Sequence, residues 1–155
     1  MADKNIKIIQ EAAEELLKQI KIDGKIKVSE IDEAFTVKIE TEDSGILIGF
    51  HGETLSGFQL ILSLMLYKKL GSWLKILVDV GDYREKQEEI LRQTALSAAE
   101  KAIATSQPVE FYELSSFERR IVHLALVDHP QVVSESIGEG RERKLVVKLK
   151  DNGSS

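Results

Sequence analysis

The chain has 155 residues, 43% of them hydrophobic, which is enough for one domain or two small ones. It contains no cysteine, which excludes a disulfide framework and a thiolate metal site. The net charge of −5 excludes a uniformly basic surface, so any nucleic-acid contact has to be a local basic patch. The charged N-terminus does not resemble a signal peptide, and the most apolar stretch, residues 55–67, is too short and too polar to span a membrane. We therefore expect a cytoplasmic protein without membrane insertion.

Residues 1–81 are predicted to form one domain with the element order αββ(αα)β. The clearest predicted elements are a helix at 5–20, strands at 25–30 and 35–39, a helix at 53–70 and a strand at 73–80. The apolar run at 46–48 is interpreted as extended, and it leads into the turn Gly49-Phe50-His51-Gly52. Helical spacing of apolar residues and period-two alternation are the signals behind these assignments.

Residues 82–150 are predicted to form a second domain with the order αβαββ. Its predicted elements are a helix at 83–106, a strand at 109–114, a helix at 115–128, and strands at 132–136 and 144–149. A glycine-containing turn at 138–141 predicts that the last two strands form a hairpin. The predicted fold class is α+β, with two small α/β sandwich domains, the second having helices on a three-stranded sheet. Residues 151–155 are predicted to be a disordered tail.

The turn at Gly49, Phe50, His51 and Gly52 is the first candidate binding site. Glycine lets the backbone approach a ligand closely, and amides at the start of the following helix favour a phosphate. Phe50 can stack on a base, but neither central residue is a fixed cation, so we expect a weaker clamp than a basic loop gives. The alternative is an ordinary turn between an apolar segment and a helix.

The second candidate site is a pair of side chains on the helix at 115–128. Arg119 and His123 are four positions apart and therefore share one helix face, with Arg120 beside them. Arginine can hold a phosphate through two hydrogen bonds, and histidine can add a hydrogen bond or stack on a base. Ser115 and Glu118 form a predicted capping box that starts this helix. The alternative is a solvated helix face, which is also the favoured interpretation for the three basic residues Arg141, Arg143 and Lys144.

Recognisable catalytic patterns are absent from the sequence. It has no GxSxG, HExxH or Walker A motif, and its histidines are poorly spaced for a shared metal. We therefore predict no enzymatic activity, no cofactor and no metal site.

The two candidate sites together resemble one known family. ERRIVHLAL, residues 118–126, resembles the core of the R-3-H domain, which is named for its arginine and histidine separated by three residues. GILIGFHGETLSGFQLILSLM, residues 45–65, resembles the KH segment of the Jag family, also called KhpB or EloR. In that family a type II KH domain (αββααβ) runs directly into an R-3-H domain, as the order here predicts.

The resemblance implies a bacterial cytoplasmic protein that binds single-stranded RNA or DNA. It further implies post-transcriptional regulation linked to cell elongation, division or sporulation. Gly49, Phe50, His51 and Gly52 would take the place of the GXXG loop, and Arg119 and His123 that of the signature pair. A KhpA-like protein with a single KH domain is an implied partner. Family members usually have a further N-terminal domain and a linker, so we expect this chain to be a short form or a truncated one.

A protein-interaction module is the main competing hypothesis. In that case the KH half would pair with another KH protein or form a homodimer, through its sheet edge or its apolar helix. Only the C-terminal half would then contact nucleic acid.

Overall fold

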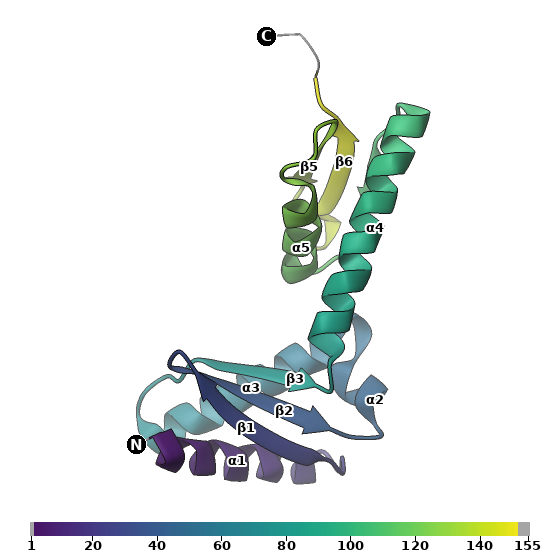
Figure 1. Ribbon diagram of the computed structural model, residues 1–155. Coiled ribbons are helices and arrows are strands. Elements are labelled where there is room, and N and C mark those ends of the chain that lie inside the picture. The colour runs from purple at the N-terminus through teal and green to yellow at the C-terminus, as the bar shows by residue number, and fades with distance from the viewer. Residues whose placement is uncertain (1, 152–155) are drawn as a thin grey trace. The chain divides into compact units, whose positions relative to one another are not determined.

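Two compact units make up the chain in the computed structural model, which describes residues 2–151 (Figure 1). The first unit extends to Arg84 and the second begins at Glu85. Each has its own buried apolar cluster and its own three-stranded sheet. The predicted α+β class with two small α/β domains is confirmed. Of the predicted tail, residues 152–155 lie outside the described residues.

The first unit has the order αββααβ. Its elements are α1 (Ala2–Gln19), β1 (Lys25–Ile31), β2 (Ala34–Glu40), α2 (Ser44–Ile48), the 3₁₀ turn η1 (Phe50–Gly52), α3 (Glu53–Leu70) and β3 (Ile76–Val80). Strand β2 is central, pairing antiparallel with β1 and parallel with β3. Helices α1 and α3 pack against each other and against this sheet (Figure 1).

Apolar periodicity accounts for the packing of the first unit. The buried residues of α3 recur every three or four positions, at Leu55, Phe58, Leu62 and Leu66. Those of β2 alternate, at Phe35, Val37 and Ile39, so one face of the strand lies on the helices. The two periods bury one stripe of the helix against one face of the sheet. This core fixes where α3 begins, and therefore where the glycine turn lies.

Two predicted extended segments of the first unit differ in the structure, and in the second unit the strand predicted at 109–114 ends at Phe111. Residues 46–48 belong to the short helix α2 rather than to an extended run. Their β-branched isoleucines favour a strand locally, but the helical turn buries Leu47 in the core, and tertiary packing overrides propensity. The strand predicted from residue 73 begins only at Ile76, because its partner strand β2 supplies pairing from Phe35 onward. Trp73 instead stacks on Tyr67, with ring centroids 4.4 Å apart.

The second unit has an antiparallel sheet of order β4-β6-β5. Its elements are α4 (Tyr83–Thr105), whose first two residues belong to the first unit, β4 (Val109–Phe111), α5 (Ser116–Leu126), β5 (Val132–Ile137), the 3₁₀ turn η2 (Gly140–Glu142) and β6 (Lys144–Leu149). Strands β5 and β6 form the predicted hairpin. Small alanines line the buried stripe of α4, which joins residues of α5 and β6 in one core.

Candidate nucleic-acid interface

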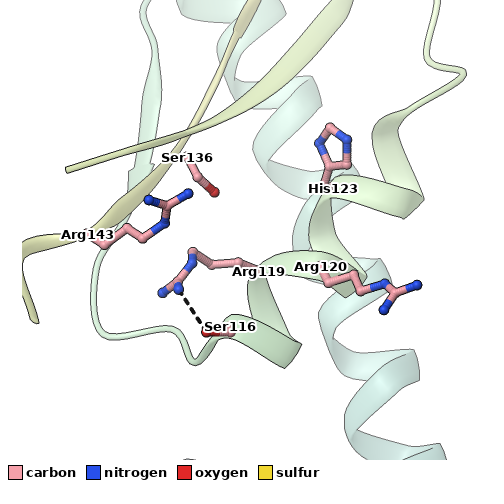
Figure 2. Close-up of a pocket in the computed structure, with 6 residues that line it drawn as sticks. All are labelled: Ser116, Arg119, Arg120, His123, Ser136 and Arg143. Atoms are coloured by element: carbon pink, nitrogen blue, oxygen red, sulfur yellow. Dashed lines mark hydrogen bonds between the residues drawn. The ribbon is translucent and has the colours of Figure 1, made fainter. Parts of the chain in front are cut away.

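A basic pocket of about 500 Å³ lies between helix α5 and the β5–β6 hairpin of the second unit. It is lined by Ser116, Arg119, Arg120, His123, Ser136 and Arg143. Figure 2 shows the guanidinium groups of Arg119 and Arg143 directed toward the same space, beside the Ser136 hydroxyl. Arg120 projects away from them in the same view. None of these six described lining residues is acidic, so they present hydrogen-bond donors and positive charge.

The start of α5 determines which residues face this pocket. Ser115 Oγ accepts a hydrogen bond from the Glu118 amide at 3.1 Å, and Glu118 Oε1 accepts one from the Ser115 amide at 3.0 Å. The predicted capping box is thereby confirmed. Glu118 itself is only 3% exposed, so this cap turns its own side of the helix toward the core. The opposite side, with Arg119 and His123, is left for the pocket.

Helical spacing predicts that α5 buries an apolar face made of Phe117, Ile121, Leu124 and Ala125, and this prediction is partly wrong. Phe117 and Leu124 are more than half exposed. Glu118 and Val122 occupy the buried side instead. On this buried side the Glu118 carboxylate accepts hydrogen bonds from the Ser115 amide and from Gln87 Nε2. Phe117 is consequently an exposed aromatic side chain in the first turn of the pocket helix.

Arg119 is half-buried and held by neutral partners. Its Nη1 donates to the Leu114 carbonyl at 2.5 Å, and its Nη2 donates to Ser116 Oγ at 3.2 Å (Figure 2). Within the described residues no carboxylate forms an ion pair with it. The guanidinium is therefore oriented by the protein while its charge is not neutralised by an acid.

His123 is tied to the hairpin. Its Nδ1 lies 2.7 Å from Ser134 Oγ on β5, at hydrogen-bonding distance, and its side chain is exposed. The bond fixes the ring plane, so the second ring nitrogen is the one that can meet a ligand. The structure thus brings the predicted residues Arg119, Arg120 and His123 to one pocket.

Arg143 also lines the pocket, although the sequence favours a solvated hairpin for Arg141, Arg143 and Lys144. Its Nη1 donates to the Gly138 carbonyl at 3.0 Å. A sequence signal for this position existed. Arg143 precedes the buried Leu145 by two residues, so strand alternation directs it to the face that carries the core.

Lys144 lies on a different set of contacts. Its Nζ is 2.8 Å from Glu110 Oε1, and Tyr112 also donates to the Glu110 carboxylate. The hydrogen bonds from Lys144 and then from Tyr112 lower the pKa of Glu110, while the Glu110 carboxylate raises the pKa of both Lys144 and Tyr112. Glu110 therefore stays ionised and offsets the charge of Lys144, which adds little to any basic surface.

The glycine loop, Gly49 to Gly52, is built differently from the expectation. The sequence predicts that the amides of Gly52, Glu53 and Thr54 are available to a phosphate, but those of Gly52 and Glu53 donate to the carbonyls of Gly49 and Phe50. The amide of Gly49 donates to the Gly45 carbonyl at 3.0 Å. The 3₁₀ turn engages the amides of Gly52 and Glu53, so a ligand would have to displace their hydrogen bonds.

Glycine at both ends of this loop satisfies internal packing. Gly49 has φ +72°, and a Cβ there would lie 2.1 Å from Thr54 Oγ1. Gly52 has φ +78°, and a Cβ there would meet Tyr83 Oη at 3.3 Å. Left-handed φ values favour glycine whatever the function. The need for glycine here is thus explained without a ligand.

Phe50 is the most ligand-accessible group of the loop. It is 63% exposed, and its ring meets that of His51 edge-on with centroids 4.1 Å apart. An exposed aromatic ring can stack on an unpaired base. The loop therefore offers a stacking surface but no fixed positive charge.

Within residues 2–151, no cluster of histidine and acidic side chains is arranged to hold a metal ion. None of the helices in that part of the chain has both the length and the apolar character that crossing a bilayer requires.

Comparison with known proteins matches both halves of the chain. Residues 7–78 match the family model of the KhpA/KhpB KH domain, and residues 89–149 match that of the R-3-H domain. The RNA-binding protein KhpB of Clostridium symbiosum is 31% identical over 153 residues, which cover 95% of this chain and 69% of that protein.

Other relatives carry the same name. The RNA-binding protein KhpB of Bacillus subtilis is 32% identical over 133 residues, covering 83% of this chain and 64% of that protein. The one from Lactiplantibacillus plantarum is 29% identical over 135 residues, covering 87% of this chain and 42% of that protein. The chain therefore spans less than two thirds of the length of these last two relatives.

Proposed function

Because this chain belongs to the KhpB (Jag) family, we propose that it binds single-stranded RNA, and that the basic pocket of its R-3-H domain is the principal contact. Family membership indicates a non-enzymatic RNA-binding protein, as the sequence analysis predicted. The observation that carries the proposal is the pocket itself. Arg119, Arg120 and Arg143 line one hollow, whose six lining residues within the described part of the chain include no carboxylate, and such a surface favours phosphate oxygens.

The glycine loop is the secondary RNA contact in this proposal. Phe50 would stack on one unpaired base, beside His51. The bonded amides of Gly52 and Glu53 make a phosphate clamp of the usual kind costly here. Binding by this loop should therefore depend little on salt, whereas binding by the basic pocket should depend strongly on it.

Single-stranded DNA is a second nucleic acid that the same pocket would accept, because its phosphates are chemically equivalent. In the cell we propose a cytoplasmic bacterial role in post-transcriptional regulation, linked to cell elongation, division or sporulation. This part of the proposal, including any partner proteins, rests on the family alone.

The proposal is tested by measuring fluorescence anisotropy of a labelled single-stranded RNA at several salt concentrations. Replacing Arg119→Ala together with His123→Ala should weaken binding roughly 10- to 100-fold, because two oriented donors to phosphate are lost. The slope of log affinity against log salt should fall by about 0.7 for each phosphate contact removed. A matched control is Arg92→Ala with His129→Ala, since Arg92 is already paired with Glu88 and Glu89.

The glycine loop is tested in the same assay with Phe50→Asp and His51→Asp, which leave Gly49 and Gly52 intact. We expect a smaller loss than in the Arg119 and His123 double variant. If the loop variant abolishes binding while the double variant behaves like its control, the basic pocket is not the principal contact and the proposal fails.

A second candidate function is pairing of the KH domain with the KH domain of another chain. Helix α3 leaves a stripe of large apolar side chains exposed, formed by Leu60, Ile61, Leu64 and Tyr67. Large apolar side chains grouped on an exposed helix face suit an interface with another protein. The partner would be a second copy or a KhpA-like protein. Sedimentation of the chain alone and after mixing with a KhpA-like protein distinguishes a homodimer from a heterodimer. Leu64→Asp should disrupt either complex.

A further inference from the structure

The β5–β6 hairpin supplies half of the basic pocket, through Arg143 and Ser136. Resting on the proposed function, we infer that these two residues form a second wall that grips the same RNA phosphate as Arg119. The ligand class is a backbone phosphodiester held between a helix arginine and a hairpin arginine. The predicted motif of the R-3-H domain accounts for the helix side alone.

The hairpin places Arg143 by its register. Strand β5 pairs with β6 so that Ile137 lies opposite Lys144 and Ser136 opposite Leu145. The register extended by one position sets Arg143 across from Gly138, and its Nη1 donates to that residue's carbonyl. Leu145 belongs to the core that includes residues of α5, and Arg143, two residues earlier with extended backbone angles, is therefore directed to the same face. Arg143 is thus held in place before any ligand arrives.

Two guanidinium groups directed into one hollow repel each other unless an anion lies between them. Each is tethered by a backbone carbonyl, that of Leu114 for Arg119 and that of Gly138 for Arg143, so neither tether neutralises charge. A guanidinium has five N–H donors, and these tethers use only some of them. The remaining donors suit the two non-bridging oxygens of one phosphodiester. The Ser136 hydroxyl, which lies beside the Arg143 guanidinium in Figure 2, would donate a further hydrogen bond.

Neighbouring basic residues show what the pocket position adds. Arg141 lies in η2, is exposed, and is not among the pocket residues. Lys144 is engaged by Glu110 on the β4 side. The three basic residues of this hairpin end therefore differ in contacts although they carry the same charge. That difference makes Arg141 a control of equal charge for Arg143.

The test compares Arg143→Gln with Arg141→Gln in the salt-dependent RNA-binding assay. Arg143→Gln should weaken binding about tenfold and reduce the salt slope by about 0.7, as expected for one lost phosphate contact on a single strand. Arg141→Gln, with the same change of charge, should weaken binding less than twofold. Equal effects of the two substitutions would overturn the inference, because general charge alone would then explain them.

A second pair of variants separates binding from the hairpin's own structure, since Arg143 also bonds Gly138. Ser136→Asp places a carboxylate in the pocket without removing that bond, and it should weaken binding more than tenfold. Ser97→Asp, on an exposed position of α4, adds the same charge elsewhere and should leave binding within about twofold. Unchanged binding by Ser136→Asp would overturn the inference even if Arg143→Gln melted at a lower temperature.

The result for Arg119 and His123 keeps the two proposals apart. If their double alanine variant loses affinity but Arg143→Gln matches Arg141→Gln, the pocket binds RNA through its helix side only and this inference fails alone. If neither the double variant nor Arg143→Gln differs from its control, the proposed function fails together with it.

Discussion

The basic pocket of the second unit and the glycine loop of the first were predicted to hold the same ligand, yet their polar groups are committed in opposite ways. In the pocket, Arg119 and Arg143 are oriented by carbonyls and keep their charge. In the loop, the amides of Gly49 and Gly52 already bond the chain's own carbonyls. A binding motif therefore indicates a binding site only when its hydrogen-bond donors are still able to bond a ligand after the chain has folded.

The largest effect that sharpens this contrast concerns Gly49. Replacing Gly49→Ala should destabilise the first unit by about 2–4 kcal/mol, because the new Cβ would collide with Thr54 and the backbone φ is left-handed. Gly45→Ala is the matched control: it lies in α2 with open space around its Cβ, and it should be neutral or stabilising. Urea unfolding of both variants measures the difference. If Gly49→Ala unfolds like Gly45→Ala, the glycine does not serve internal packing.

The capping box gives the next largest effect, and it links stability to binding on the pocket side. Ser115→Ala should cost about 1 kcal/mol of the free energy of unfolding, because the Glu118 amide loses its acceptor. Fraying of the first turn also loosens Ser116 and Arg119, so RNA affinity should fall by a fewfold. Ser115→Asp, which keeps an acceptor at the cap, should restore stability. A loss of affinity that persists in Ser115→Asp would show that the cap does not act by ordering the pocket.

Phe50 tests what the glycine loop still contributes. Phe50→Ala should weaken RNA binding by less than about tenfold, since stacking on one base supplies roughly 1–3 kcal/mol at most and the loop adds no fixed charge. The salt slope should stay unchanged, in contrast to the pocket variants. A fluorescent base in the RNA, quenched on stacking, reports the contact directly. A reduced salt slope in Phe50→Ala would mean that this loop does hold a phosphate.

Most of the elements and the helix side of the pocket could be predicted from the sequence because both follow from local patterns, whereas the helix α2 could not. Periodicity located α3, β2 and the hairpin, and a four-residue spacing brought Arg119 and His123 together. Local patterns missed features that depend on how groups are used in three dimensions. Phe117 is exposed because Glu118 and Val122 occupy the buried side of α5, and the amides of Gly52 and Glu53 are bonded because the glycine loop forms a 3₁₀ turn.

The position of Arg143 in the pocket could not be predicted from local sequence patterns either. Its position beside Ser136 depends on pairing between two strands and on which face the helix covers. Alternation from Leu145 gives the face, but only the assembled unit shows that α5 brings Arg119 to the same side. A charged residue in a turn is usually solvated, so the sequence favours a solvated position for Arg143. Its neighbours Arg119 and Ser136 place it in the pocket instead.

The smallest expected effect concerns Glu110, which forms an ion pair with Lys144. The neighbouring Arg143 bonds the Gly138 carbonyl instead. Because the hydrogen bond from Lys144 lowers the pKa of Glu110, this carboxylate stays charged at neutral pH, and the pair would lose its attraction only as pH falls through that lowered pKa. Glu110→Gln should release the charge of Lys144 and raise RNA affinity by about twofold or less, since exposed charges act weakly at physiological salt. Adding Lys144→Gln should return affinity to the starting value. If the RNA affinity stays raised after the second substitution, the Glu110 carboxylate itself repels RNA. In that case Lys144, like Arg141, does not contact the ligand.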